Sequence, residues 1–75
     1  MKLQHVKFEN TDKWYSTDYL PDTPREILLY TEDFGLASGY YQDETDKWFS
    51  FRWQCYVHPT YWREMPRYDG NKSSL

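Results

Sequence analysis

Cys55 and His58 are the first pair of side chains that could carry out chemistry, because only two residues separate them. A cysteine and a histidine can act as nucleophile and base, or as two ligands of a metal ion. A structural zinc site needs four ligands, however, and His5 is the only other residue of either type. A nucleophilic pair is also disfavoured, because residues three apart on a strand point to opposite faces. The sequence therefore predicts that Cys55 is buried as a small apolar side chain.

Carboxylates are the second set of candidates. Asp43, Glu44 and Asp46 lie in one polar stretch, and Glu32 and Asp33 lie in another. Paired carboxylates can bind a divalent cation or transfer protons, but at hairpin tips acids more often protect sheet edges from aggregation. The chain has no glycine-rich phosphate loop, nucleophile elbow or HExxH motif. We therefore expect no catalytic residue, no metal and no cofactor, and a protein that is not an enzyme.

Aromatic rings are the dominant feature of the composition, with four Trp, eight Tyr and four Phe among 75 residues. Rings bury ~150–250 Å² each, so they can build the core of a small domain that is poor in aliphatic residues. In residues 47–53 the strand period places Phe49, Phe51 and Trp53 on one face and Trp48, Ser50 and Arg52 on the other. We expect the wholly aromatic face to pack inward. Trp48 and Arg52 then remain as candidates for an exposed contact.

Residues 58–68 form a second aromatic segment, with two prolines, three rings and a methionine. An extended segment laid over a sheet can pack one side and bind with the other, so core and interface both remain open for it. Tyr, Trp and Arg are the types enriched in interface hot spots. The predicted partner-binding residues are Tyr61, Trp62, Arg63, Arg67 and Tyr68, with Trp48 and Arg52 as second choices.

Three runs of residues have the composition of strands, namely 25–31, 35–42 and 47–57. Short polar connections separate them, which is typical of an antiparallel meander. Gly39 in the second run indicates a bulge or a ring lying across the strand. Residues 3–8 could pair at a sheet edge, and little helix is expected anywhere in the chain.

These elements predict a mainly β fold, with a small α+β fold as the alternative. We expect a single domain over residues 1–68, built as an antiparallel meander of three or four strands with an aromatic core. An extended C-terminal segment would pack over it, and residues 69–75 would form a flexible polar tail.

Charge and cysteine content narrow the class of protein. A single cysteine excludes an intrachain disulfide and fits a reducing cytoplasm. No window approaches the ~20 apolar residues of a membrane span, so no membrane partner is expected. The net charge of −3 disfavours nucleic acid as a partner, because such binding depends on neutralising phosphates.

Several short motifs agree in order and spacing with a known family. They are Trp14, Leu20-Pro21, the strand 27–29, the run 39–41, and Thr60, Tyr61, Trp62 and Pro66. This pattern resembles a small phage and prophage family of unknown function that opens with W…LP and closes on a T-H-W-M-P-L-P consensus. Tyr61 stands where the family has His, and Arg63-Glu64 replace Met-Pro. The resemblance implies a bacteriophage accessory protein in the bacterial cytoplasm and carries over no catalytic residue.

The functional expectation combines these points. It is a non-enzymatic, phage-encoded accessory protein that binds a bacterial or phage protein through an aromatic and arginine surface. Such binding would inhibit or modulate a host defence or metabolic enzyme. The alternative is a single-stranded nucleic-acid-binding module that stacks bases on exposed rings. The surplus of rings on a short chain is also compatible with a homodimer.

Overall fold

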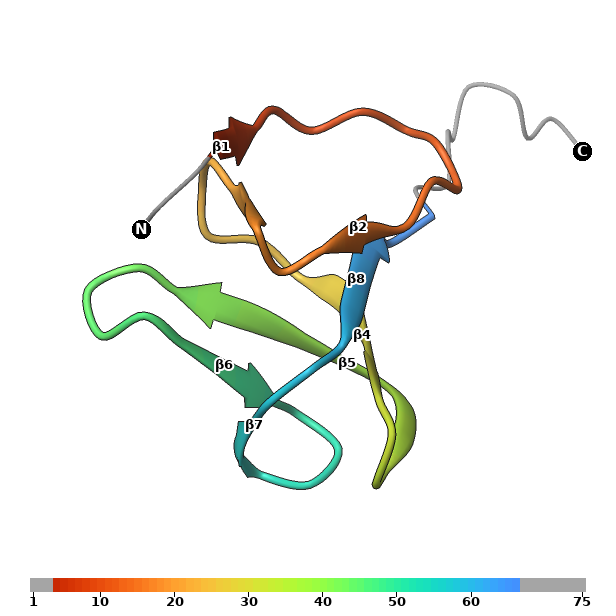
Figure 1. Cartoon of the computed structure of the whole chain (residues 1–75), viewed down its shortest axis with the longest axis vertical. Helices are drawn as coiled ribbons and strands as arrows, with labels where there is room; N and C mark the ends of the chain where they lie inside the picture. The colour runs from red at the N-terminus through yellow and green to blue at the C-terminus, as the bar shows by residue number, and fades with distance from the viewer. Residues whose placement is uncertain (1–3, 67–75) are drawn as a thin grey trace, which may run out of the picture.

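The computed structural model of this protein describes residues 4–66, and all regular structure in that range is β (Figure 1). The strands are β1 (Gln4–Val6), β2 (Tyr15–Ser16), β3 (Tyr19–Pro21), β4 (Ile27–Thr31), β5 (Gly35–Gln42), β6 (Lys47–Ser50), β7 (Cys55–Val57) and β8 (Tyr61–Glu64). The prediction of a mainly β fold is confirmed. The boundary at residue 68 and the polar tail 69–75 lie outside the described residues.

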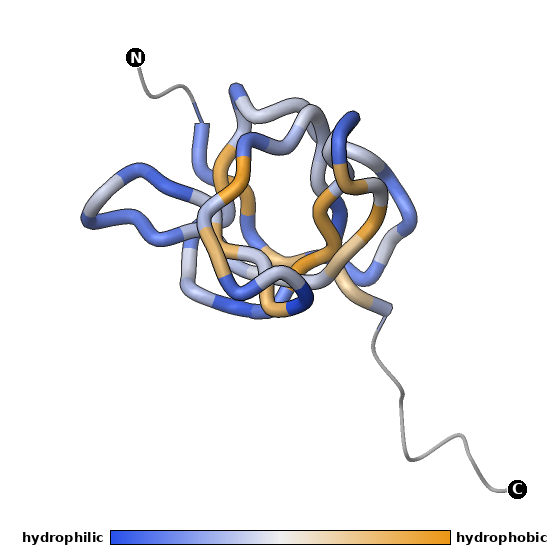
Figure 2. Tube along the Cα trace, turned by 90° about the horizontal axis from the view of Figure 1, so that it is seen from below, coloured by the Kyte–Doolittle hydropathy of each residue, from blue (hydrophilic) through white to orange (hydrophobic). Residues whose placement is uncertain are grey.

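Six of the strands form one antiparallel sheet in the order β2-β8-β4-β5-β6-β7. Strand β4 pairs with β5, β5 with β6, and β6 with β7, which confirms the predicted meander. The short strand β1 pairs in parallel with β3 and forms a separate two-stranded ribbon. Seen from below, the chain curls around a central region (Figure 2). Several of its most hydrophobic segments line this region.

Strand β4 shows why these residues form a half-buried sheet. Ile27, Leu29 and Thr31 are buried, whereas Tyr30 between them is exposed. This alternation places one side of the strand in the core and the other in solvent. Strand β5 has the bounds predicted for residues 35–42 and pairs with β4 over its first five residues.

Gly39 allows β5 to approach β6 closely. A Cβ at this position would collide with the backbone oxygen of Phe49 and lie 2.8 Å from Cδ1 of Leu29. The register stays continuous here, since Gly39 pairs with Ser50. The glycine is therefore needed for close backbone approach and not for the bulge or crossing ring that the sequence indicated.

The core is aromatic, as predicted, and Trp62 lies at its centre with no exposed surface. The ring of Trp62 stacks on Tyr15 at a centroid distance of 4.7 Å, and its Nε1 donates a hydrogen bond of 2.8 Å to the carbonyl of Tyr19. The other buried apolar residues are Leu20, Ile27, Leu29, Tyr41, Trp48 and Val57.

Residues 47–57 were predicted as one strand, and this prediction is wrong. They form a hairpin in which residues 51–54 turn between β6 and β7. Gln54 adopts a positive φ of 56°, and its amide donates to the carbonyl of Ser50 over 2.8 Å. The Ser50 hydroxyl also accepts a hydrogen bond from the amide of Trp53, which closes the turn.

The face of β6 that packs inward is the opposite of the one predicted. Trp48 and Ser50 are buried, Phe49 is half-buried, and Phe51 and Trp53 are exposed. The expectation that Phe49, Phe51 and Trp53 pack inward is therefore wrong. Phe49 lies on the outer side of β6, and the strand ends before Phe51 and Trp53. Their places in the core are filled by Trp48, Tyr41 and Val57.

The C-terminal segment differs from its prediction as well. It is extended, but β8 lies within the sheet between β2 and β4 instead of packing over it. Figure 1 shows β8 crossing back beside β4 after the β6–β7 hairpin. Insertion gives Tyr61 and Trp62 strand partners on both sides, which satisfies their backbone groups.

Buried Tyr41 gives the fold a pH dependence in the alkaline range. Burial, reinforced by a 2.6 Å hydrogen bond from its hydroxyl to Oδ1 of Asp46, raises the pKa of Tyr41 above its ordinary value. An unfolded tyrosine ionises near pH ~10. Stability from this group is therefore complete below pH ~10 and is lost as the pH rises through the folded pKa. Urea unfolding between pH 8 and 11 should show a falling free energy of unfolding for the wild type.

In Tyr41→Phe the free energy of unfolding should fall much less steeply with pH. The raised pKa of buried Tyr15 leaves a smaller dependence on pH. Tyr30→Phe, which removes an exposed hydroxyl, is the matched control and should keep the wild-type profile. An equally steep decline in Tyr41→Phe would contradict the assignment.

Candidate functional site

The predicted binding residues on β8 divide between the two faces of the sheet. Tyr61 is exposed and Arg63 is half-buried, whereas Trp62 between them is enclosed in the core. Trp48 is only 8% exposed and lies 6.5 Å from Trp62 between ring centroids. The surface roles predicted for Trp48 and Trp62 are thus corrected, because both rings are needed to fill the core.

The remaining predicted residues do not join this site. Arg52 is exposed in the β6–β7 turn, where its guanidinium lies 5.0 Å from the ring centroid of Trp53. Arg67 and Tyr68 lie outside the described residues. The structure thus keeps Tyr61 and Arg63 as neighbours on one face and places Arg52 elsewhere.

Trp14, Tyr30 and Tyr61 line an open notch of about 370 Å³, here named the aromatic notch. Tyr30 and Tyr61 lie directly opposite each other on β4 and β8. Trp14 immediately precedes β2, which pairs with the other edge of β8. The three side chains are 40%, 37% and 46% exposed, respectively. Sequence reasoning found Tyr61 but missed Trp14 and Tyr30, because only the pairings of β8 with β2 and β4 bring them together.

A cationic group flanks the aromatic notch. The Arg63 guanidinium lies 5.8 Å from the ring centroid of Trp14, a distance at which a cation is attracted to an aromatic face. No carboxylate in residues 4–66 forms an ion pair with Arg63. The Nζ of Lys13 lies instead 5.3 Å from the ring centroid of Tyr15, which packs in the core, so Lys13 is not part of the notch. The notch therefore combines apolar rings with positive charge on a chain whose net charge is −3.

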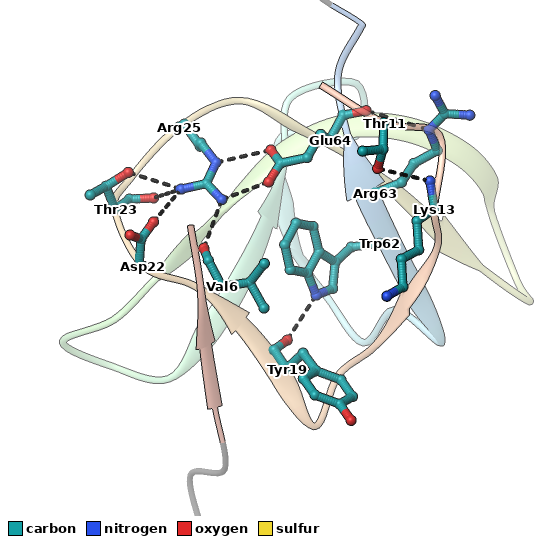
Figure 3. Close-up of polar contacts among 10 residues, drawn as sticks. All are labelled: Val6, Thr11, Lys13, Tyr19, Asp22, Thr23, Arg25, Trp62, Arg63 and Glu64. Carbon is teal, nitrogen blue, oxygen red and sulfur yellow. Dashed lines mark hydrogen bonds and ion pairs between the residues drawn. The ribbon is translucent and has the colours of Figure 1, made fainter. Parts of the chain in front are cut away.

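A buried ion pair holds the end of β8 next to this site. Arg25 donates from Nε and Nη2 to the two carboxylate oxygens of Glu64 over 2.9 and 2.7 Å (Figure 3). Its Nη1 donates to Asp22 and Thr23, and its Nη2 also donates to the carbonyl of Val6. The hydrogen bond to Glu64 raises the pKa of Arg25 further, so the guanidinium remains charged.

This arrangement connects β8 to β1 and to the loop before β4. Sequence reasoning missed it, since Arg25 and Glu64 are 39 residues apart and neither carries a local motif. Its role is structural, because every donor of the guanidinium faces the protein's own oxygens. It fixes the strand that carries Tyr61 and Arg63.

A second exposed aromatic surface covers the outer side of β5, β6 and the β6–β7 hairpin. It consists of Tyr40, Phe49, Phe51 and Tyr56, here named the outer ring cluster, with ring centroids 5.6–6.1 Å apart. The Nζ of Lys47 lies 5.2 Å from the ring centroid of Tyr56. Sequence reasoning placed Phe51 in the core and so did not find this surface.

The residues considered for catalysis or metal binding do not form a site together. Cys55 is a free and exposed thiol, which corrects its expected burial, and His58 is exposed as well. In the part of the chain that the structure describes, no three His, Cys, Asp or Glu side chains are grouped to hold a metal ion. Asp46 accepts the hydrogen bond of Tyr41, and Asp43 and Glu44 are exposed in the β5–β6 turn.

Comparisons with known proteins give no match: no family model, no curated protein and no solved structure is similar to this chain. The resemblance to a phage family stays a prediction. Among residues 4–66, no helix has the length and apolar character to cross a membrane.

Proposed function

We propose that this protein is a non-enzymatic binding protein that engages a protein partner through the aromatic notch. The observation that carries the proposal is the cluster of Trp14, Tyr30 and Tyr61, exposed around an apolar hollow beside Arg63. Trp, Tyr and Arg are the side chains that dominate the binding energy of protein interfaces. Large rings held in solvent around one hollow are therefore best explained as contact residues.

The sheet holds the side chains of the aromatic notch in place. Tyr30 and Tyr61 stand on adjacent paired strands, and the ion pair between Arg25 and Glu64 fixes the end of β8. A site held in place by a sheet loses little conformational freedom when it binds, so more of the contact energy appears as affinity.

The resemblance to a phage family supports a finer version of this proposal. In that version, the protein is a phage-encoded accessory protein that inhibits or modulates a host defence or metabolic enzyme in the bacterial cytoplasm. The exposed free thiol of Cys55 fits a reducing compartment.

Capture from bacterial lysate tests the proposal. Immobilised wild-type protein should retain a specific bacterial protein, and Tyr61→Ala should reduce its recovery at least about tenfold, as expected for a hot-spot residue. Tyr56→Ala, which removes an exposed ring from the outer ring cluster, is the matched control and should retain the partner. The identified protein is then purified and titrated against each variant by calorimetry. Equal affinity for wild type and Tyr61→Ala would refute the use of the notch.

The outer ring cluster supports a second candidate function. Its contacting rings beside Lys47 could stack the bases of a single-stranded nucleic acid. The net charge of −3 weighs against it. A labelled oligonucleotide titrated at low salt against wild type and Phe51→Ala decides the point, and absence of binding removes this candidate. Light scattering of the same samples detects a homodimer formed through these rings.

A further inference from the structure

The three rings of the aromatic notch present hydrogen-bond donors that meet no acceptor within residues 4–66. These are Nε1 of Trp14 and the hydroxyls of Tyr30 and Tyr61. Some other rings of the same types do meet an acceptor within the described residues. Nε1 of Trp62 donates to the carbonyl of Tyr19, and the hydroxyl of Tyr41 donates to Asp46. A ligand of the notch should therefore be apolar and should also offer acceptors to three donors.

The backbone beneath the notch excludes one common mode of peptide binding. A peptide that adds a strand to a sheet needs a free edge. Tyr30 lies on β4, which pairs with β5 and β8, and Tyr61 lies on β8, which pairs with β4 and β2. Neither strand has a free edge at these residues, and the edge strand β2 beside Trp14 is only two residues long, so we expect the ligand to be held mainly through its side chains and its carbonyl groups.

A helical ligand is a poor match for the three donors, because its carbonyls are bonded within the helix. A polyproline II segment is a good match. It has no internal hydrogen bonds, its carbonyls point outward, and its prolines have no N–H to satisfy. The notch is lined by aromatic side chains alone, which suits proline rings. With three residues per turn, prolines three apart return to the same side.

We propose that the aromatic notch binds a proline-rich segment of the partner in polyproline II conformation, with an acidic residue next to the prolines. The acidic residue is inferred from Arg63, which lies over Trp14 and has no carboxylate partner in residues 4–66. This inference rests on the proposed function of the notch and names the chemistry of its partner.

Synthetic peptides test the inference on the full chain. The probe is a ten-residue peptide with prolines three apart and two adjacent aspartates. Three matched peptides replace the prolines by alanine, replace the aspartates by lysine, or form an acidic helix. Binding is measured by calorimetry and by the shift of the Trp14 indole N–H signal in NMR spectra.

The proline-aspartate peptide should bind and shift the Trp14 signal, and the alanine peptide should bind at least about tenfold more weakly. Tyr61→Ala should weaken binding about tenfold as well, and Tyr61→Phe, which keeps the ring, should weaken it by several-fold through the lost donor. Arg63→Met should remove the preference for aspartate over lysine. Tyr56→Ala, on the outer ring cluster, should bind as the wild type does.

Equal binding of the proline and alanine peptides, or binding without a shift at Trp14, would overturn the inference. Stronger binding of the helical peptide would also overturn it, as would a dimer in wild type that Tyr61→Ala converts to monomer. The capture experiment tests the proposed function independently of the peptides. If Tyr61→Ala loses the captured protein but no peptide binds, the notch is a binding site and only the proline-rich ligand is wrong.

Discussion

Glu64→Ala is expected to destabilise the fold by about 3–5 kcal/mol, because it leaves the Arg25 guanidinium buried without its counter-ion. The side chains of Arg25 and Glu64 are 9% and 1% exposed, so water cannot replace the lost carboxylate. Asp22 still pairs with Nη1, but Nε and Nη2 lose their acceptor oxygens on Glu64. A domain of this size has a total stability of roughly 4–11 kcal/mol, so the change consumes much of it.

Two variants separate loss of the ion pair from loss of a carboxylate. Glu26→Ala removes an exposed glutamate near the same loop and should change the free energy of unfolding by less than about 0.5 kcal/mol. Replacing both Arg25 and Glu64 by methionine removes the charges together and should recover much of the loss. Urea unfolding followed by circular dichroism measures all four proteins. A loss below about 1 kcal/mol in Glu64→Ala would show that the pair is solvated.

The sequence predicts the centre of this sheet well. The alternation in residues 27–31 and the run 35–42 are local signals, and strands joined by a short turn pair with each other. The aromatic core also follows from composition, since few aliphatic residues are available to build one. These features depend on neighbours in the chain, which is why they could be predicted.

The turn at residues 51–54 could not be predicted in this way. It has no glycine, proline or asparagine, and Gln54 takes the positive φ that such residues usually adopt. Without a turn signal, KWFSFRW is indistinguishable from a longer strand. The choice of the inward face was wrong from Trp48 onward, because Trp48 packs against Trp62 in the core while Phe49 lies on the outer side.

The candidate site depends on pairings between distant parts of the chain. Tyr30 meets Tyr61, and Arg25 meets Glu64, only because β8 inserts between β2 and β4. Sequence reasoning selected Tyr61, Trp62 and Arg63 together by residue type. A strand separates neighbours onto opposite faces, so only Tyr61 and Arg63 reach the surface.

Strand β8 thus serves the core and the site at once. Trp62 and Glu64 point inward, where they bind Tyr19 and Arg25. Tyr61 points outward into the notch. A change that shifts the register of β8 by one residue would exchange these faces, so the inward pair fixes the position of the outward one.

Trp62→Ala is expected to cost about 3–5 kcal/mol, since it removes the largest fully buried side chain of the described residues. The change empties the space between Tyr15 and Trp48 and leaves the carbonyl of Tyr19 without its donor. This loss consumes much of the roughly 4–11 kcal/mol expected for a domain of this size, and urea unfolding followed by near-ultraviolet circular dichroism measures it. Trp62→Phe keeps a ring in this space and should lose less, about 1–3 kcal/mol, through the unsatisfied carbonyl and the smaller volume.

Trp53→Ala is the control, because it also removes an indole ring, but one that is exposed in the β6–β7 turn. It should cost about 1 kcal/mol or less. A Trp62→Ala protein that unfolds cooperatively with near wild-type stability would contradict the central place of this ring. The expected result also decides which variants can report on binding. Trp62→Ala lowers binding by destabilising the whole fold, whereas Tyr61→Ala removes an exposed ring from a sheet that remains folded.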